Sequence, residues 1–215
     1  MKRKYDTVLF DFDGTLFDTG EGILKSVQYA AESFGYNEPD LDALRSFVGP
    51  PLELSFARRY KIPIEKSREM VKKFRDRYKV KGVLECKPYP DIFPFVKELS
   101  DSGYSVCVAT GKPTPYTIEI LERYGYLNHF SAVLGSEFNG TRMEKSEVIA
   151  ELLCNSDKST AVMVGDRDND VLGAKACGIP CIGVNWGFAE PGELINAGAI
   201  RVVDNVSELR QALFF

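Results

Sequence analysis

Two aspartates, Asp11 and Asp13, directly follow the apolar run 7–10 and are separated by one residue. Side chains alternate faces along a strand, so both carboxylates are expected on one side, with Phe12 on the other. Thr15 offers a hydroxyl and an amide just beyond the strand end. An Asp-Gly pair alone more often marks only a turn, but two acids this close favour binding of a metal ion and a phosphate.

Further polar groups also follow apolar, β-branched runs. They are Gly165-Asp166-Arg167-Asp168-Asn169-Asp170 after the run 160–164, Thr110-Gly111-Lys112 after the run 104–109, and Lys145 after the short run 132–134. In open parallel sheets, ligands bind outside the carboxyl ends of the strands, where loops and helix N-termini converge. The four segments together supply acids for a divalent cation, a nucleophile, groups for anionic oxygens, and a cation. This set predicts phosphoryl transfer.

The order of these motifs resembles that of the haloacid dehalogenase superfamily and, within it, of the phosphoglycolate-phosphatase-like members. That family's pattern is Asp-x-Asp-Gly-Thr, a Thr or Ser after a hydrophobic strand, a Lys, and Gly-Asp-x-x-x-Asp. The matching residues here are Asp11 to Thr15, Thr110, Lys145, and Gly165-Asp166 with Asp170, and the segment 183–188 also resembles a loop of that group. The resemblance implies an α/β fold, a doubly wound parallel sheet (Rossmann-like core) with an inserted α-helical cap domain.

The expected domains are a catalytic core of residues 1–16 and 88–215 and a helical cap of residues 17–87. Within the proposed cap there is no convincing buried-strand run, whereas helical periodicity recurs, for example from Ile64 through Tyr78. Pro88-Tyr89-Pro90 marks the return to alternating strands and helices. Closure of such a cap is expected to exclude water and to present groups that recognise the substrate.

Assigning charge to the first motif predicts a mechanism. Asp11 attacks phosphorus in line and forms an aspartyl-phosphate. Asp13 protonates the leaving oxygen and then activates water for the second step. Because two adjacent carboxylates would repel a phosphate dianion, a hard cation is required, and Mg²⁺ suits oxygen ligands best.

The resemblance implies which groups hold the metal. They are the Asp11 carboxylate, the Asp13 backbone carbonyl and the Asp166 carboxylate. Asp170 is interpreted either as a direct metal ligand or as a support for one, because the spacing alone does not decide.

The resemblance also implies the phosphate-binding groups. Thr110 and the Gly111 amide would bind phosphoryl oxygens, and Lys145 would neutralise the transferring group and orient Asp11. Lys112 is interpreted equally well as a solvated lysine at a helix start.

Three residues are candidates for substrate specificity: Thr15, Arg45 and Phe47. Arg45 could meet a substrate carboxylate, although a surface arginine is the commoner role. Phe47 could stack on a nucleobase, although a core role is commoner. We therefore predict a phosphatase for a small phosphomonoester, phosphoglycolate-like or another sugar or organic-acid phosphate, with a 5′-nucleotidase or a phosphomutase as alternatives. A receiver domain, which is also phosphorylated on Asp, is disfavoured because receivers carry the phosphoacceptor on a later strand and lack a cap.

Composition excludes other classes of protein. The formal charge of −4 and the pI near 5.3 give no electrostatic footprint for nucleic acid or an anionic membrane. The chain has neither a membrane-length apolar stretch nor an apolar secretory signal, so a cytoplasmic location is expected. The predicted partner is a small phosphorylated metabolite, and the oligomeric state is left open. The five scattered cysteines are read as reduced thiols, and the single histidine, His129, leaves proton transfer to a carboxylate.

Overall fold

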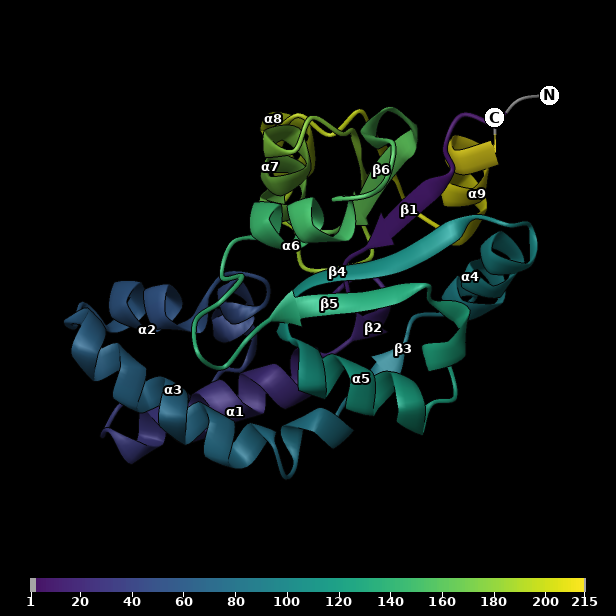
Figure 1. The fold of residues 1–215 in the computed structure, drawn as a ribbon. Coiled ribbons are helices and arrows are strands. Elements are labelled where there is room, and N and C mark those ends of the chain that lie inside the picture. The colour runs from purple at the N-terminus through teal and green to yellow at the C-terminus, as the bar shows by residue number, and fades with distance from the viewer. Residues whose placement is uncertain (1–2, 215) are drawn as a thin grey trace. The chain divides into compact units, whose positions relative to one another are not determined.

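The computed structural model describes residues 3–214 and contains a six-stranded parallel sheet with helices on both faces (Figure 1). The strand order is β5-β4-β1-β6-β7-β8, and every pairing is parallel. The strands are β1 (Thr7–Phe10), β4 (Ser105–Pro113), β5 (Ala132–Ser136), β6 (Ala161–Gly165), β7 (Cys181–Val184) and β8 (Arg201–Val203). The expected doubly wound α/β fold is confirmed.

Helices connect these strands and cover both faces of the sheet. They are α4 (Ile92–Asp101), α5 (Thr114–Arg123), α6 (Lys145–Leu152), α7 (Asp168–Ala176), α8 (Glu193–Ala197) and α9 (Val206–Phe214). Short 3₁₀ turns, Leu127–His129 and Lys158–Thr160, precede β5 and β6. Since helices shield the central strands on both sides, every residue of β1 and β6 is buried, which explains their continuous apolar sequences.

The segment between β1 and β4 forms a separate group of helices. It contains α1 (Gly20–Ser33), a 3₁₀ turn (Asp42–Phe47), α2 (Leu52–Tyr60), α3 (Ile64–Tyr78) and a second 3₁₀ turn (Gly82–Leu84). α3 spans the range that the helical periodicity predicts. Its apolar side is buried at Met70, Val71 and Phe74, while its many charged residues lie outside this stripe.

The chain divides into two compact units, which we call the core unit (residues up to Phe17 and from Pro88 onward) and the helical unit (Asp18–Lys87). The boundary falls one residue later than expected. Phe17 packs in the core unit, with its ring 4.8 Å from that of Phe12 and 5.3 Å from that of Phe93. The short strands β2 (Phe17–Asp18) and β3 (Lys87–Pro88) pair where the chain passes from one unit to the other.

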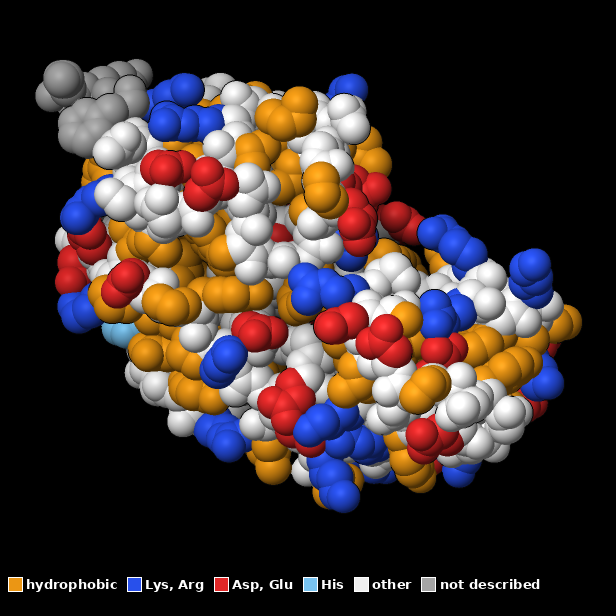
Figure 2. All heavy atoms as spheres, turned by 180° about the vertical axis from the view of Figure 1, so that it is seen from behind, with side chains coloured by type: hydrophobic (Ala, Val, Ile, Leu, Met, Phe, Trp, Pro, Cys, Tyr) orange, Lys and Arg blue, Asp and Glu red, His pale blue; other side chains and the backbone are white. Residues whose placement is uncertain are grey.

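One face of the molecule carries both signs of charge (Figure 2). Figure 2 shows acidic and basic side chains interspersed on the face that it presents. No helix within residues 3–214 has the length and apolar character that crossing a membrane requires.

Candidate active site

Three buried aspartates meet at the carboxyl edge of the sheet. Asp11 follows β1 and Asp166 follows β6, and these neighbouring strands are in register up to Phe10 and Val164. Asp170 lies in the first turn of α7. One carboxylate oxygen from each of the three aspartates lies within 4.8 Å of the others. The fold therefore brings Asp11 together with Asp166, which lies 155 residues later in the chain.

Lys145 lies among these acids. Its Nζ is 2.7 Å from Asp11 Oδ1, 2.8 Å from Asp170 Oδ1 and 3.0 Å from the carbonyl oxygen of Ala109. Burial by itself would disfavour the ammonium ion, but the charges of Asp11 and Asp170 outweigh it and raise the pKa of Lys145. The lysine is therefore charged and holds one oxygen of Asp11 in place.

Two features position Lys145. A capping box between Glu144 and Glu147 starts α6 at this residue. On α7, Gly173 leaves room for it, because a Cβ at that glycine would lie 2.8 Å from Lys145 Cβ. The N-terminus of α6 can thus approach α7 closely enough for the lysine to reach the acids.

The buried cluster contains more acidic than basic groups. With all three carboxylates ionised, one ammonium would leave a surplus of two negative charges. Burial, together with Asp170 and despite Lys145, raises the pKa of Asp11 to about 7. Burial and the charges of Asp11 and Asp170 likewise raise the pKa of Asp166 well above its usual range.

These residues fit a divalent cation. A charge of +2 would balance the surplus, and an all-oxygen donor set suits Mg²⁺. Next to Asp170 in the chain, the side-chain oxygen of Asn169 is buried without a hydrogen-bond partner among residues 3–214. Asp11, Asp166 and Asp170 are the side chains that could hold the ion.

Asp166 is enclosed by backbone and by two glycines. A Cβ at Gly14 would lie 2.1 Å from Asp166 Oδ2, and one at Gly187 would lie 2.2 Å from it. The Phe188 amide donates to Oδ2 at 2.7 Å, and the Thr15 hydroxyl donates to Oδ1 at 3.3 Å. The carboxylate therefore has a fixed orientation.

This arrangement corrects one expectation and adds two residues. Thr15 is fully buried with its hydroxyl on Asp166, so it supports that carboxylate rather than contacting a substrate. Gly187 and the Phe188 amide were not predicted as site groups. The sequence signal for them is the segment 183–188, which begins in the buried strand β7 and runs beyond its end at Val184.

The segment after Ala109 contains the predicted phosphate-binding residues. Thr110 is buried, and its hydroxyl accepts a hydrogen bond from the Lys112 amide at 3.2 Å. Gly111 is exposed, and its carbonyl oxygen accepts from the Ser136 hydroxyl at 2.7 Å. Lys112 is buried, with its Nζ 2.8 Å from Asp13 Oδ1. The interpretation of Lys112 as a solvated lysine is therefore wrong.

The two specificity candidates in the helical unit have different environments. Phe47 is 2% exposed and packs edge-on against Phe56, with ring centroids 4.9 Å apart. This ring belongs to the interior of the helical unit and offers no face to a nucleobase, which corrects its assignment to substrate recognition. Arg45 is exposed, so its guanidinium is accessible from solvent.

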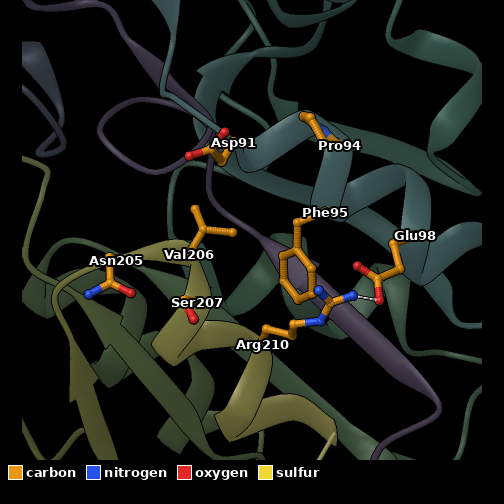
Figure 3. A pocket seen from close by; sticks show the side chains of 8 residues that line it. All are labelled: Asp91, Pro94, Phe95, Glu98, Asn205, Val206, Ser207 and Arg210. Carbon is orange, nitrogen blue, oxygen red and sulfur yellow. Dashed lines mark hydrogen bonds and ion pairs between the residues drawn. The ribbon is translucent and has the colours of Figure 1, made fainter.

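A hollow of about 360 Å³ lies between α4 and α9 of the core unit (Figure 3). Its lining residues are Asp91, Pro94, Phe95, Glu98, Asn205, Val206, Ser207 and Arg210. The guanidinium of Arg210 pairs with Glu98 inside it. None of the aspartates or lysines of the acidic cluster lines this hollow, so it is separate from the candidate active site.

Comparison with known proteins agrees with this geometry. Residues 8–184 match the family model described as haloacid dehalogenase-like hydrolase. A predicted phosphatase from Clostridium acetobutylicum has a crystal structure that superposes with a TM-score of 0.94 at 41% identity, covering 97% of both chains.

Relatives that are named for an activity differ in that activity. A 5′-nucleotidase of Pseudomonas aeruginosa is 38% identical over 98% of this chain and 96% of its own length. The tyrosine-protein kinase PtkA of Mycobacterium tuberculosis is 33% identical, over 96% of this chain and 72% of its own. A phosphoglycolate phosphatase of Agrobacterium fabrum is 26% identical over 96% of this chain and 91% of its own.

Proposed function

The chain belongs to the haloacid dehalogenase-like hydrolases and is a phosphatase, and on that premise we propose a magnesium-dependent phosphomonoesterase that works through an aspartyl-phosphate on Asp11. The observation that carries this proposal is the buried cluster in which Lys145 contacts both Asp11 and Asp170 beside Asp166. A structural ion pair would match its charges, whereas this cluster has more carboxylates than ammonium groups, which suits a divalent cation that could in turn bind a phosphate.

The first half-reaction forms a bond between an Asp11 carboxylate oxygen and phosphorus, while the bond from phosphorus to the ester oxygen breaks. Asp13 gives its proton to that leaving oxygen. Lys145 holds Asp11 Oδ1, so the other oxygen, Oδ2, is the one we assign to attack. The product alcohol then departs.

In the second half-reaction, water attacks the phosphorus and the bond to Asp11 breaks. Asp13 accepts the proton of this water, which returns it to its starting state. Inorganic phosphate is released, and atoms and charges balance over the cycle.

Binding of the phosphoryl group falls to the segment after Ala109 and to the cation. We assign the Thr110 hydroxyl and the Gly111 amide to the phosphoryl oxygens, because both lie in the last part of β4, beyond its pairing with β1 and at the same edge as Asp11. Mg²⁺, held by the Asp11 and Asp166 carboxylates and the Asp13 carbonyl, with Asp170 as ligand or support, would neutralise charge on the transferring group.

For the substrate we propose a small phosphorylated metabolite, such as phosphoglycolate or another organic-acid or sugar phosphate. The helical unit would act as the cap, and the exposed Arg45 is its candidate for a substrate carboxylate. A 5′-nucleotide is the second candidate, supported by the nucleotidase relative at 38% identity. The buried ring of Phe47 would not contribute to recognition of a base.

The test is phosphate release from a panel of phosphoglycolate, sugar phosphates and 5′-nucleotides, with and without Mg²⁺. Release is expected only with the metal, and Asp11→Asn, with its fold checked by thermal unfolding, should release none. The panel should include acceptor alcohols, because a phosphomutase would pass the phosphoryl group to a hydroxyl without net phosphate release. No release from any compound by well-folded protein would reject the proposal.

A further inference from the structure

The end of β4 departs from regular strand geometry at three residues. Ala109 pairs with Leu134 and Pro113 pairs with Ser136, so β4 advances four residues where β5 advances two. The extra residues lie within Thr110–Lys112 and form a bulge. Bulges redirect side chains and recur beside active sites. Here the bulge turns Lys112 into the interior of the core unit.

Two residues of β5 hold this bulge. A Cβ at Gly135 would lie only 2.0 Å from the Lys112 carbonyl oxygen, so this close approach requires glycine. The next residue, Ser136, donates its hydroxyl to the Gly111 carbonyl oxygen at 2.7 Å. Within the bulge, the Lys112 amide donates to Thr110. The backbone that carries Lys112 is therefore fixed on both sides.

The Lys112 side chain ends on the proposed acid–base residue. Its Nζ is 2.8 Å from Asp13 Oδ1 and 5.8 Å from the centre of the Phe12 ring. The side chains of the pair are 4% and 12% exposed. Buried ion pairs give little net stability, because desolvation offsets their attraction. This pair is buried and lies just beyond the strand that precedes Asp11. We therefore consider that it orients a side chain rather than stabilising the fold.

We propose that Lys112 is a positioning residue that fixes the Asp13 carboxyl group for proton transfer. This inference rests on the proposed function. Lys112 holds Oδ1, and Oδ2 carries the proton that passes to the leaving oxygen as the phosphorus–oxygen bond of the ester breaks. In the second half-reaction Oδ2 accepts the proton of the attacking water. The Lys112 ammonium keeps its own protons throughout.

The competing role for a lysine here is direct binding of the phosphoryl group. The two roles differ in how the damage from removing Lys112 depends on the leaving group. A general acid matters for an alkoxide, which leaves poorly without a proton, and matters little for p-nitrophenolate, which leaves as a stable anion. Loss of a phosphate contact slows both substrates alike.

The experiment measures kcat/KM, which reports the first half-reaction, for p-nitrophenyl phosphate and for the alkyl phosphate of the panel that wild type hydrolyses best. Lys112→Met should lower kcat/KM for the alkyl ester by about 10²–10⁴-fold, and for the aryl ester by under about tenfold. Lys112→Arg, which keeps a donor and a charge, should recover much of the loss.

A double variant tests whether Lys112 acts through Asp13. Asp13→Asn should show the same dependence on the leaving group, and adding Lys112→Met should cause no further loss, because the two residues act as one unit. Lys97→Met is the matched control. It removes an exposed Lys–Asp pair on α4 of the same unit, and both substrates should react as with wild type.

Equal losses on both substrates, or additive losses in the double variant, would overturn the inference and assign Lys112 to phosphate binding. If thermal unfolding shows that Lys112→Met does not fold, Lys112→Gln, which keeps a neutral donor, is judged by the same criterion. Failure of wild type to hydrolyse either ester would instead reject the proposed function, so the two failures are distinguishable.

Discussion

The acidic cluster of the core unit and the ion pairs of the helical unit use charge in opposite ways. In the helical unit, Arg59 binds Glu38 through two nitrogens at 2.8 and 2.6 Å, and Arg77 binds Glu85 at 2.8 and 2.9 Å. These hydrogen bonds lower the pKa of both glutamates despite their partial burial. In the acidic cluster, burial and mutual repulsion raise the pKa of Asp11 and Asp166.

The difference separates charge that holds a fold from charge that serves chemistry. A carboxylate matched by one guanidinium is stable as it stands. Carboxylates that outnumber the neighbouring cations repel one another until a metal ion binds. Groups with such perturbed pKa values are typical of functional sites. The predictions that follow test this contrast.

The largest effect on stability is expected for Lys145→Met. Removing the one ammonium among three buried carboxylates leaves their repulsion unopposed, which should destabilise the protein by about 3–5 kcal/mol. Phosphatase activity should fall by about 10²–10³-fold. Chemical unfolding and phosphate release measure the two effects. Unchanged values for both would show that the cluster does not hold the mutually repelling carboxylates described above.

Magnesium should stabilise the protein increasingly as the pH rises from 5 to 8. Without metal, the folded state keeps a proton on Asp11 up to about pH 7, whereas the unfolded chain loses it near its ordinary value of 3.8. Metal-free stability therefore falls over that range as the pH rises. The bound cation removes this loss.

The size of that stabilisation follows from ligand linkage, about 2.7 kcal/mol at a hundredfold excess of free metal over Kd. Thermal unfolding with and without Mg²⁺ measures it at each pH. Asp166→Asn, which removes one proposed ligand, is the control and should show little response. A shift that is independent of pH and survives in this variant would place the metal elsewhere.

In the helical unit, Glu38→Gln should reduce stability by about 1–3 kcal/mol, because the Arg59 guanidinium loses its charged partner. The sign of its pH dependence is opposite to that of Asp11. The lowered pKa of Glu38 means that its stabilisation is present above its unfolded value of 4.5 and is lost as the pH falls through the folded value. Urea unfolding at pH 7 and pH 4 checks this, and a larger effect at pH 4 would contradict it.

The smallest effect is expected for Lys97→Met. Lys97 and Asp101 form an exposed i, i+4 pair on α4, with side chains 56% and 64% exposed. Solvent screens such pairs, so stability should change by under about 0.5 kcal/mol. The same unfolding assay sets this baseline. If Lys97→Met changed stability as much as Glu38→Gln does, burial would not explain why some ion pairs stabilise the protein more than others.

Much of this molecule follows from local sequence patterns. The continuous apolar runs predict β1 and β6, the helical periodicity predicts α3, and the acids that follow strands predict where Asp11 and Asp166 meet. Such predictions succeed because strand and helix periods are properties of neighbouring residues, and because parallel strands carry their carboxyl ends to one edge.

Tertiary structure decided what each polar side chain touches. Lys112 lies inward only because a bulge in β4 rests against Gly135, and Thr15 supports Asp166 only because β1 and β6 are neighbours. Phe47 is buried because it packs against Phe56, which lies on another element of the helical unit. Burial and ion pairing arise between residues far apart in the chain, so a local pattern can supply the groups for chemistry but cannot assign their partners.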